Sequence, residues 1–91
     1  MSEGVSPLRK FLLDLSRELT DQNVEDLKYL AEFGDGVSEQ CKSPLGVFRE
    51  LQRVGKIAPE KLDFLKELMK NITRHDLVTS IGIWFIFKFS A

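Results

Sequence analysis

Apolar residues recur at helical spacing along most of this 91-residue chain. The first stripe predicts a helix over about residues 7–19 and consists of Leu8, Phe11, Leu12, Leu15 and Leu19. These positions fall at i, i+3, i+4, i+7 and i+11, on one side of a helix. No segment before residue 81 alternates between apolar and polar side chains as a half-buried strand would. The pattern therefore predicts helices and no strands.

Three further segments carry a clear stripe. Helices are predicted over about residues 20–33, 44–54 and 59–71, with apolar positions at Val24, Leu27, Leu30, Ala31, Val47, Phe48, Leu51, Val54, Leu62, Leu65, Leu68, Met69 and Ile72. The polar stretch 34–43 holds one short helical turn near 37–40, or none. A last helix begins near Thr73 and continues the buried face with Leu77, Val78 and Ile81.

These short helices and brief loops predict an all-α fold, a compact antiparallel bundle of five or six helices. The core is expected to contain Phe11, Leu15, Leu27, Leu30, Phe48, Leu51, Leu65, Leu68 and Leu77.

Proline, glycine and serine predict the helix ends. Ser6-Pro7, Ser43-Pro44 and Ala58-Pro59 are expected to start helices, because proline is tolerated at the first helical position and serine can cap it. Gly34-Asp35-Gly36 and Gly55 are expected to end helices. Thr73 and Asp76 have the spacing of a capping box.

Charge and residue chemistry exclude several functions. The 13 Lys and Arg residues interleave with 14 Asp and Glu residues, which argues against a nucleic-acid binder with one basic face. A lone Cys41 and a lone His75 cannot supply the four ligands of a zinc site, and they make no convincing catalytic set. We therefore expect no enzyme activity, no metal and no cofactor.

The N-terminus and the cysteine content bear on location. There is no apolar run at the N-terminus and so no secretory signal. Cys41, interpreted as a loop thiol without a role, cannot form an internal disulfide, which fits a reducing compartment. A cytoplasmic protein is expected.

Three segments resemble the death effector domain family. They are Leu27-Lys28-Tyr29-Leu30, the loop and Leu-rich helix from Lys56 to Leu68, and Arg74-His75-Asp76-Leu77. The resemblance covers about residues 7–81, and residues 1–81 are assigned to this domain. It implies a non-enzymatic module that associates with other death effector domains, those of adaptors, initiator caspases and FLICE-like inhibitors, and so regulates apoptosis.

The resemblance also implies a surface charge triad. In the family, the Arg and Asp of the motif, here Arg74 and Asp76, join an acidic residue of the second helix. The matching position holds Asn23, so Glu25 or Asp26 would have to substitute, or the triad is incomplete. Leu77 completes the motif and is included among the expected interaction residues.

Two apolar residues lie away from the buried stripes. Leu13 is nearly opposite Leu12 and Leu15, and Tyr29 points away from Val24 and Leu27. The family uses an exposed apolar patch on its first two helices for domain contacts, so Leu13 and Tyr29 are predicted to mediate association, including self-association.

Residues 82–91 depart from the family pattern. The run from Ile83 to Phe87 is apolar, too short to span a bilayer, and typical of an aggregation-prone strand. It could fold back as extra core, bind a membrane surface or partner, or be the end of a truncated or alternatively spliced product. The last is favoured.

Two other functions stay open at this point. A caspase-recruitment or pyrin domain would keep the fold and the homotypic mode of binding, although the Arg74-to-Leu77 motif argues against it. A small helical nucleic-acid binder would show an affinity that falls steeply with salt.

Overall fold

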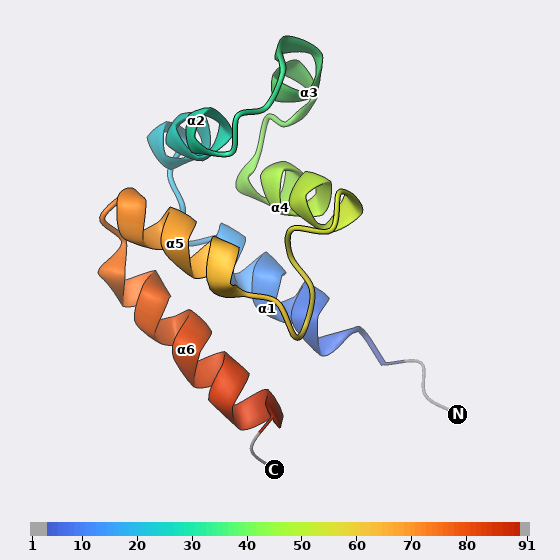
Figure 1. Ribbon diagram of the computed structural model, residues 1–91, viewed down its shortest axis with the longest axis vertical. Helices are drawn as coiled ribbons and strands as arrows, with labels where there is room; N and C mark the ends of the chain where they lie inside the picture. The colour runs from blue at the N-terminus through green and yellow to red at the C-terminus, as the bar shows by residue number, and fades with distance from the viewer. Residues whose placement is uncertain (1–3, 90–91) are drawn as a thin grey trace.

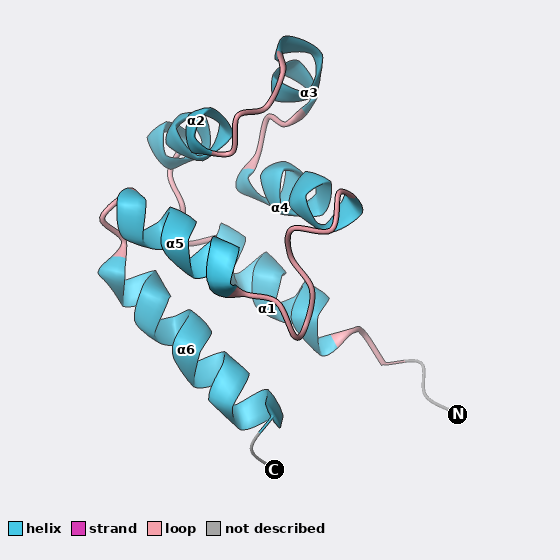
Figure 2. Ribbon diagram, in the orientation of Figure 1, coloured by secondary structure: helices cyan, strands magenta, loops and turns pink. Residues whose placement is uncertain are grey.

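A computed structural model describes residues 4–89 of the chain. It consists of six helices: α1 (Pro7–Ser16), α2 (Asp21–Leu30), α3 (Asp35–Gln40), α4 (Pro44–Arg53), α5 (Asp63–Asn71) and α6 (His75–Phe89). Within residues 4–89 there is no strand, only an isolated bridge between Ala58 and Lys61 (Figure 2). The prediction of an all-α bundle of five or six helices is confirmed.

Helices α5 and α6 form an antiparallel pair, and α4 packs against both α1 and α2 (Figure 1). The short helix α3 lies at the far end from α6. The described helices α1, α2, α4, α5 and α6 turn their apolar stripes towards one core, in which Phe48, Leu51 and Leu65 are fully enclosed. No helix in residues 4–89 is long and apolar enough to cross a membrane.

Most of the predicted core is buried, with two exceptions, and one further position of the predicted stripes is exposed. Phe11 is only partly buried, while Leu30 and Val54 are exposed. Leu30 is the last residue of α2, and Val54 is the residue that caps the end of α4. A residue at a helix end no longer has the neighbouring helix over it, so the periodic pattern overestimates its burial.

Two of the three helix starts predicted at prolines are confirmed. Ser6 accepts a hydrogen bond at its Oγ from the Arg9 N–H at 3.4 Å, and Ser43 accepts one from the Gly46 N–H at 3.1 Å. The start at Pro59 is wrong, and α5 begins four residues later at Asp63. Pro59 instead lies in a turn that two backbone hydrogen bonds between Ala58 and Lys61 close.

The predicted ends of the first two helices also shift. Helix α1 ends at Ser16 instead of Leu19, and α2 ends at Leu30 instead of Phe33. Glu32, with φ of 59°, takes the left-handed conformation that was expected of a glycine, and Gly34 caps the start of α3. Gly55 does end the α4 segment as predicted, with φ of 82°.

The capping box at the start of α6 is wrong. Thr73 has a left-handed φ of 58°, and its hydroxyl donates to the carbonyl oxygen of Ile72. The Asp76 carboxylate pairs with Arg74 instead of returning to Thr73. The helix begins at His75, and the Arg74 carbonyl oxygen accepts the N–H groups of Leu77 and Val78.

The described part of the apolar tail is helical and not a strand. Helix α6 continues to Phe89 without interruption at residue 82, so the division of the chain there stays a prediction. The Trp84 ring stacks on the Phe11 ring, with centroids 5.0 Å apart and planes at 17°. Trp84 and Phe85 thereby add to the core, whereas residues 90–91 lie outside the described part.

Candidate protein-interaction site

Arg74, in the turn between α5 and α6, joins three separate parts of the chain. Its Nε and Nη2 atoms donate to the two carboxylate oxygens of Asp76 at 3.2 and 3.0 Å. Its Nη1 atom donates to the backbone oxygen of Glu18 at 2.7 Å and to Oδ1 of Asn23 at 3.1 Å. One guanidinium thus ties the α1–α2 turn and the start of α2 to the start of α6.

Asn23 lies at the position where the family carries an acid, and its amide oxygen accepts the hydrogen bond from Arg74. The sequence placed Asn23 at this position but did not predict this hydrogen bond. Its Oδ1 also accepts the Thr20 N–H at 3.0 Å, while the Thr20 hydroxyl oxygen accepts the Asn23 N–H at 3.1 Å. This reciprocal pair is a capping box that fixes the start of α2. Thr20 followed by an amide three residues later was the signal that could have identified Asn23.

Neither of the acids expected to substitute reaches Arg74. Glu25 pairs with Lys28 at 3.2 Å, and Asp26 accepts a hydrogen bond from Gln22 at 3.0 Å. They follow Asn23 by two and three residues, so their side chains leave α2 in other directions than the Asn23 side chain. The expectation that Glu25 or Asp26 completes the triad is therefore wrong.

The pair of Arg74 and Asp76 is electrostatically coupled. The hydrogen bonds to Asp76 raise the pKa of Arg74, and the hydrogen bonds from Arg74 lower the pKa of Asp76. Only 23% of the Arg74 side chain is exposed, whereas Asp76 is mostly in solvent. Leu77 is buried in the core, so its expected role as a contact residue does not fit the structure.

Tyr29 is the most exposed large apolar side chain of α2, at 84%. The exposed Leu30 follows it, and Glu32 lines the same shallow hollow. Glu25 and Asp26, four and three residues earlier, lie on the same side of the helix. We call these five residues the Tyr29 face, an aromatic ring surrounded by carboxylates.

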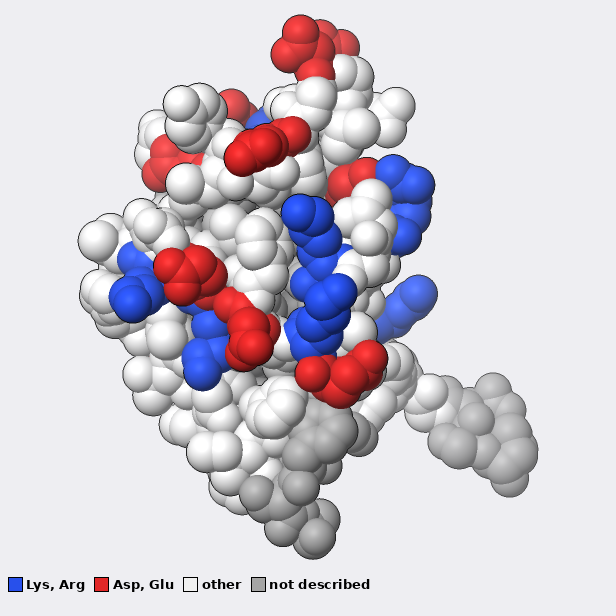
Figure 3. Space-filling model, viewed as in Figure 1, with Lys and Arg blue, Asp and Glu red and all other residues white. Residues whose placement is uncertain are grey.

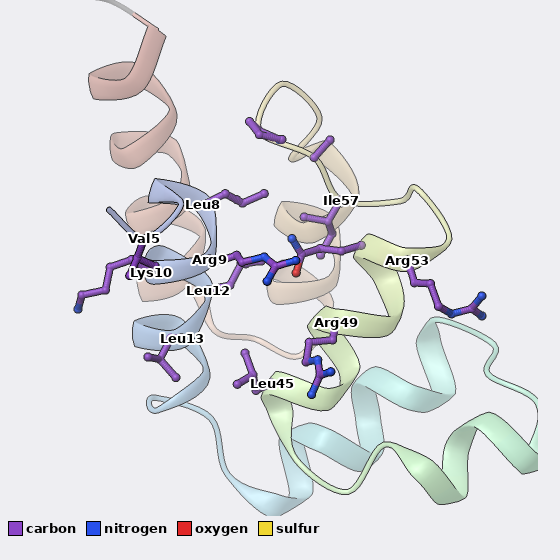
Figure 4. A pocket seen from close by; sticks show the side chains of 13 residues that line it. Val5, Leu8, Arg9, Lys10, Leu12, Leu13, Leu45, Arg49, Arg53 and Ile57 are labelled. Carbon is purple, nitrogen blue, oxygen red and sulfur yellow. The ribbon is translucent and has the colours of Figure 1, made fainter. Parts of the chain in front are cut away.

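Leu13 lies in a different hollow, between α1, α4 and the loop that follows α4 (Figure 4). We call this space of about 730 Å³ the Leu13 hollow, and its apolar lining consists of Val5, Leu8, Leu12, Leu13, Leu45, Ile57, Ala58 and Pro59. Leu13 is half-buried there, not exposed as predicted. The two hollows share no lining residue, so the structure does not bring Leu13 and Tyr29 together in one hollow.

The charged residues around the Leu13 hollow are all cations. Lys10 pairs with Asp14 at 2.9 Å, and Arg53 pairs with Glu50. Among residues 4–89, Arg9 and Arg49 form no ion pair, and Figure 4 shows Arg9 extending from α1 across the hollow towards α4. No carboxylate lines the hollow, which leaves two arginines available to an acidic ligand.

Residues with other chemistry do not converge in the described part of the chain. No group of three or more His, Cys, Asp or Glu residues within 4–89 could hold a metal ion. Cys41 lies in the loop after α3, as expected, but its side chain is buried there, with Sγ 3.6 Å from the backbone oxygen of Gly46. Burial raises the pKa of this thiol, so it is protonated at neutral pH and belongs to the core.

Comparison with known proteins places these features in a family. The model of the family described as death effector domain matches residues 8–82. A mouse protein described as CASP8 and FADD-like apoptosis regulator is 34% identical over 79 residues, which cover 85% of this chain and 16% of that protein. The chain thus spans about a sixth of the curated relative it matches. No solved structure matches.

Proposed function

Because this chain belongs to the death effector domain family, we propose that it binds other death effector domains, and copies of itself, and thereby regulates the assembly of initiator caspases in apoptosis. In this proposal it acts by contact and not by catalysis. The observation that carries the proposal is the Tyr29 ring, held 84% exposed among carboxylates. The family excludes the alternatives of a caspase-recruitment or pyrin domain.

The two halves of the contact are the Tyr29 face and the Leu13 hollow of a neighbouring domain. Tyrosine is enriched at interface hot spots, and the hollow offers an apolar surface to receive the ring. The carboxylates of Asp26 and Glu32 match the unpaired Arg9 and Arg49, whereas Glu25 already pairs with Lys28. Complementary potentials of this kind favour the correct partner and its orientation.

The contact joins two unlike faces, and this determines the assembly. Each domain presents one Tyr29 face and one Leu13 hollow, so it can bind two neighbours at once. Such a heterologous contact forms a ring if its rotation closes and a helical filament if it does not. Partners with a death effector domain of their own, such as adaptors, initiator caspases and FLICE-like inhibitors, could add to the end of the same assembly.

Arg74 acts in this proposal through the position of α2. The guanidinium holds Glu18 and Asn23, which lie just before and at the start of the helix that carries Tyr29. The exposed Asp76 is the member of the charge motif that remains available for contact with a partner. We therefore assign Arg74 an orienting role and Asp76 a contact role.

A charge-exchange experiment tests the proposed contact. Arg49→Glu and Asp26→Arg should each abolish filament growth of the purified chain in light scattering, because each places like charges across the contact. Mixing the two variants should restore growth as alternating oligomers, since the unchanged surfaces still match and the altered surfaces attract. Neither side chain supports the core, so circular dichroism should match the wild type.

Substitutions at Tyr29 provide the matched control. Tyr29→Phe should keep the filament-type oligomers, whereas Tyr29→Asp should abolish growth through this contact because it would bury a carboxylate without a partner. If Tyr29→Asp assembles like the wild type, the Tyr29 face is not the contact. A wild-type chain that stays monomeric at high concentration, with or without a partner domain, would refute association altogether.

A further inference from the structure

The C-terminal half of α6 exposes an apolar face that no other part of residues 4–89 covers. Ile83, Ile86 and Phe87 are 49%, 61% and 76% exposed. The opposite side of the helix packs on the core through Ile81 and through the stack of Trp84 on Phe11. A helix with apolar residues on all sides is normally enclosed, so a second surface is expected to cover this face.

Gly82 lies at the edge of this face, one turn before Ile86, and no contact within the described chain requires a glycine there. It lies inside α6, and a Cβ atom built on it would meet nothing within 4 Å. Glycine destabilises the interior of a helix relative to alanine, and here neither a turn nor a close contact in the chain requires it. Its missing side chain leaves a notch beside Ile86, open to the side chain of another molecule.

The absence of acidic residues indicates what covers the face. From Leu77 to Ala91 the sequence contains a single charged residue, Lys88, and no acid. In Figure 3 the described surface over the lower end of α6 shows no charged side chain. When a surface meets its own copy across a two-fold axis, like charges oppose each other, and an uncharged surface avoids this repulsion.

We propose that this face binds the same face of a second copy, with the two α6 helices antiparallel. When such a pair is centred at position 84, position 82 of one helix lies opposite position 86 of the other. Ile86 of each copy then fills the notch over Gly82 of the other copy. The contact is isologous and closes with two copies, so it is distinct from the proposed contact of the Tyr29 face and does not depend on it.

The test uses the full chain carrying Tyr29→Asp, in which the proposed filament contact is already blocked. Sedimentation equilibrium should detect a monomer–dimer equilibrium. Gly82→Ala should weaken the dimer by about tenfold or more, because an added methyl group overpacks the notch. The same variant should raise the melting temperature measured at low concentration, where the chain is monomeric, since alanine favours the helix. A lower affinity together with a more stable monomer would not arise from misfolding.

Two further variants define the face. Ile86→Asp should give monomers with an unchanged circular dichroism spectrum, because Ile86 is outside the core. Val54→Asp, at an exposed apolar position at the end of α4, should leave the dimer intact. These results would place the contact on α6 and not on apolar surface in general.

Three results would overturn the proposal. The Tyr29→Asp chain could stay monomeric at the highest concentration, or its dimer could be unaffected by Gly82→Ala and Ile86→Asp. The monomeric chain could also bind phosphatidylcholine vesicles in a way that Ile86→Asp abolishes, which would assign the face to a lipid surface. All three are measured without the Tyr29 contact, so they leave the proposed function untouched.

Discussion

Arg74 shows how one side chain can link turns that are far apart in the sequence. Its partners Glu18 and Asn23 lie 56 and 51 residues away. Arg74→Ala should lower the free energy of unfolding by about 1.5–3 kcal/mol, the usual range for hydrogen bonds to a charged group. Urea denaturation measures the change. Arg53→Ala is the matched control, because Arg53 is exposed and pairs only with Glu50 in its own helix, so its removal should lower stability less.

Because the Arg74 guanidinium joins separate turns, its removal is expected to affect the fold as well as any contact with a partner. If Arg74→Ala leaves stability unchanged and still abolishes association, the guanidinium contacts a partner directly. If Arg74→Ala lowers both stability and association, and a higher concentration of the partner domain restores assembly, the orienting role is supported.

Asp76 should make stability depend on pH in the acid range. Its pKa is lowered in the folded chain, chiefly by the hydrogen bonds from Arg74. A lowered pKa contributes stability above the unfolded-state value, near 3.9, and the contribution is lost as pH falls through the folded-state value. Asp76→Asn should therefore flatten the fall in melting temperature below about pH 4. An unchanged profile would contradict this coupling, although Glu50, whose pKa is also lowered, keeps part of the slope.

At the level of helices, the stripes were predictable and the boundaries were not. The apolar spacing identified every buried position of α5 and most of those of α1 and α4, because burial there follows from periodicity. The boundaries were wrong at Pro59, Glu32 and Thr73. The backbone conformations of these residues depend on hydrogen bonds made by neighbouring turns, which the apolar pattern does not show. The charge site was partly predictable. The Arg74–Asp76 pair is local, whereas Asn23 becomes its partner only because the fold brings the start of α2 to the turn before α6.

Thr73 offers a test of the corrected start of α6. A β-branched residue is disfavoured in the left-handed conformation that its φ of 58° requires, whereas asparagine tolerates it. Thr73→Asn should therefore raise the free energy of unfolding by about 0.5–1 kcal/mol. Under the capping-box interpretation the change would have no such benefit. Thermal denaturation distinguishes the two, with Thr79→Asn in the exposed helix interior as a control expected to destabilise slightly.

For the whole molecule, the two proposed surfaces differ in physical character, and this makes them separable without mutation. The contact between the Tyr29 face and the Leu13 hollow joins carboxylates to arginines, so added salt should weaken it by screening. The α6 contact contains no charged pair and buries apolar side chains, so salts such as sulfate should strengthen it. Raising sodium chloride from low to about physiological concentration should therefore shorten filaments, measured by light scattering, while dimers persist. If filaments persist in salt, burial of the Tyr29 ring, and not its acidic surroundings, dominates the contact with the Leu13 hollow. If dimers dissociate in salt, the α6 interface is not an uncharged one.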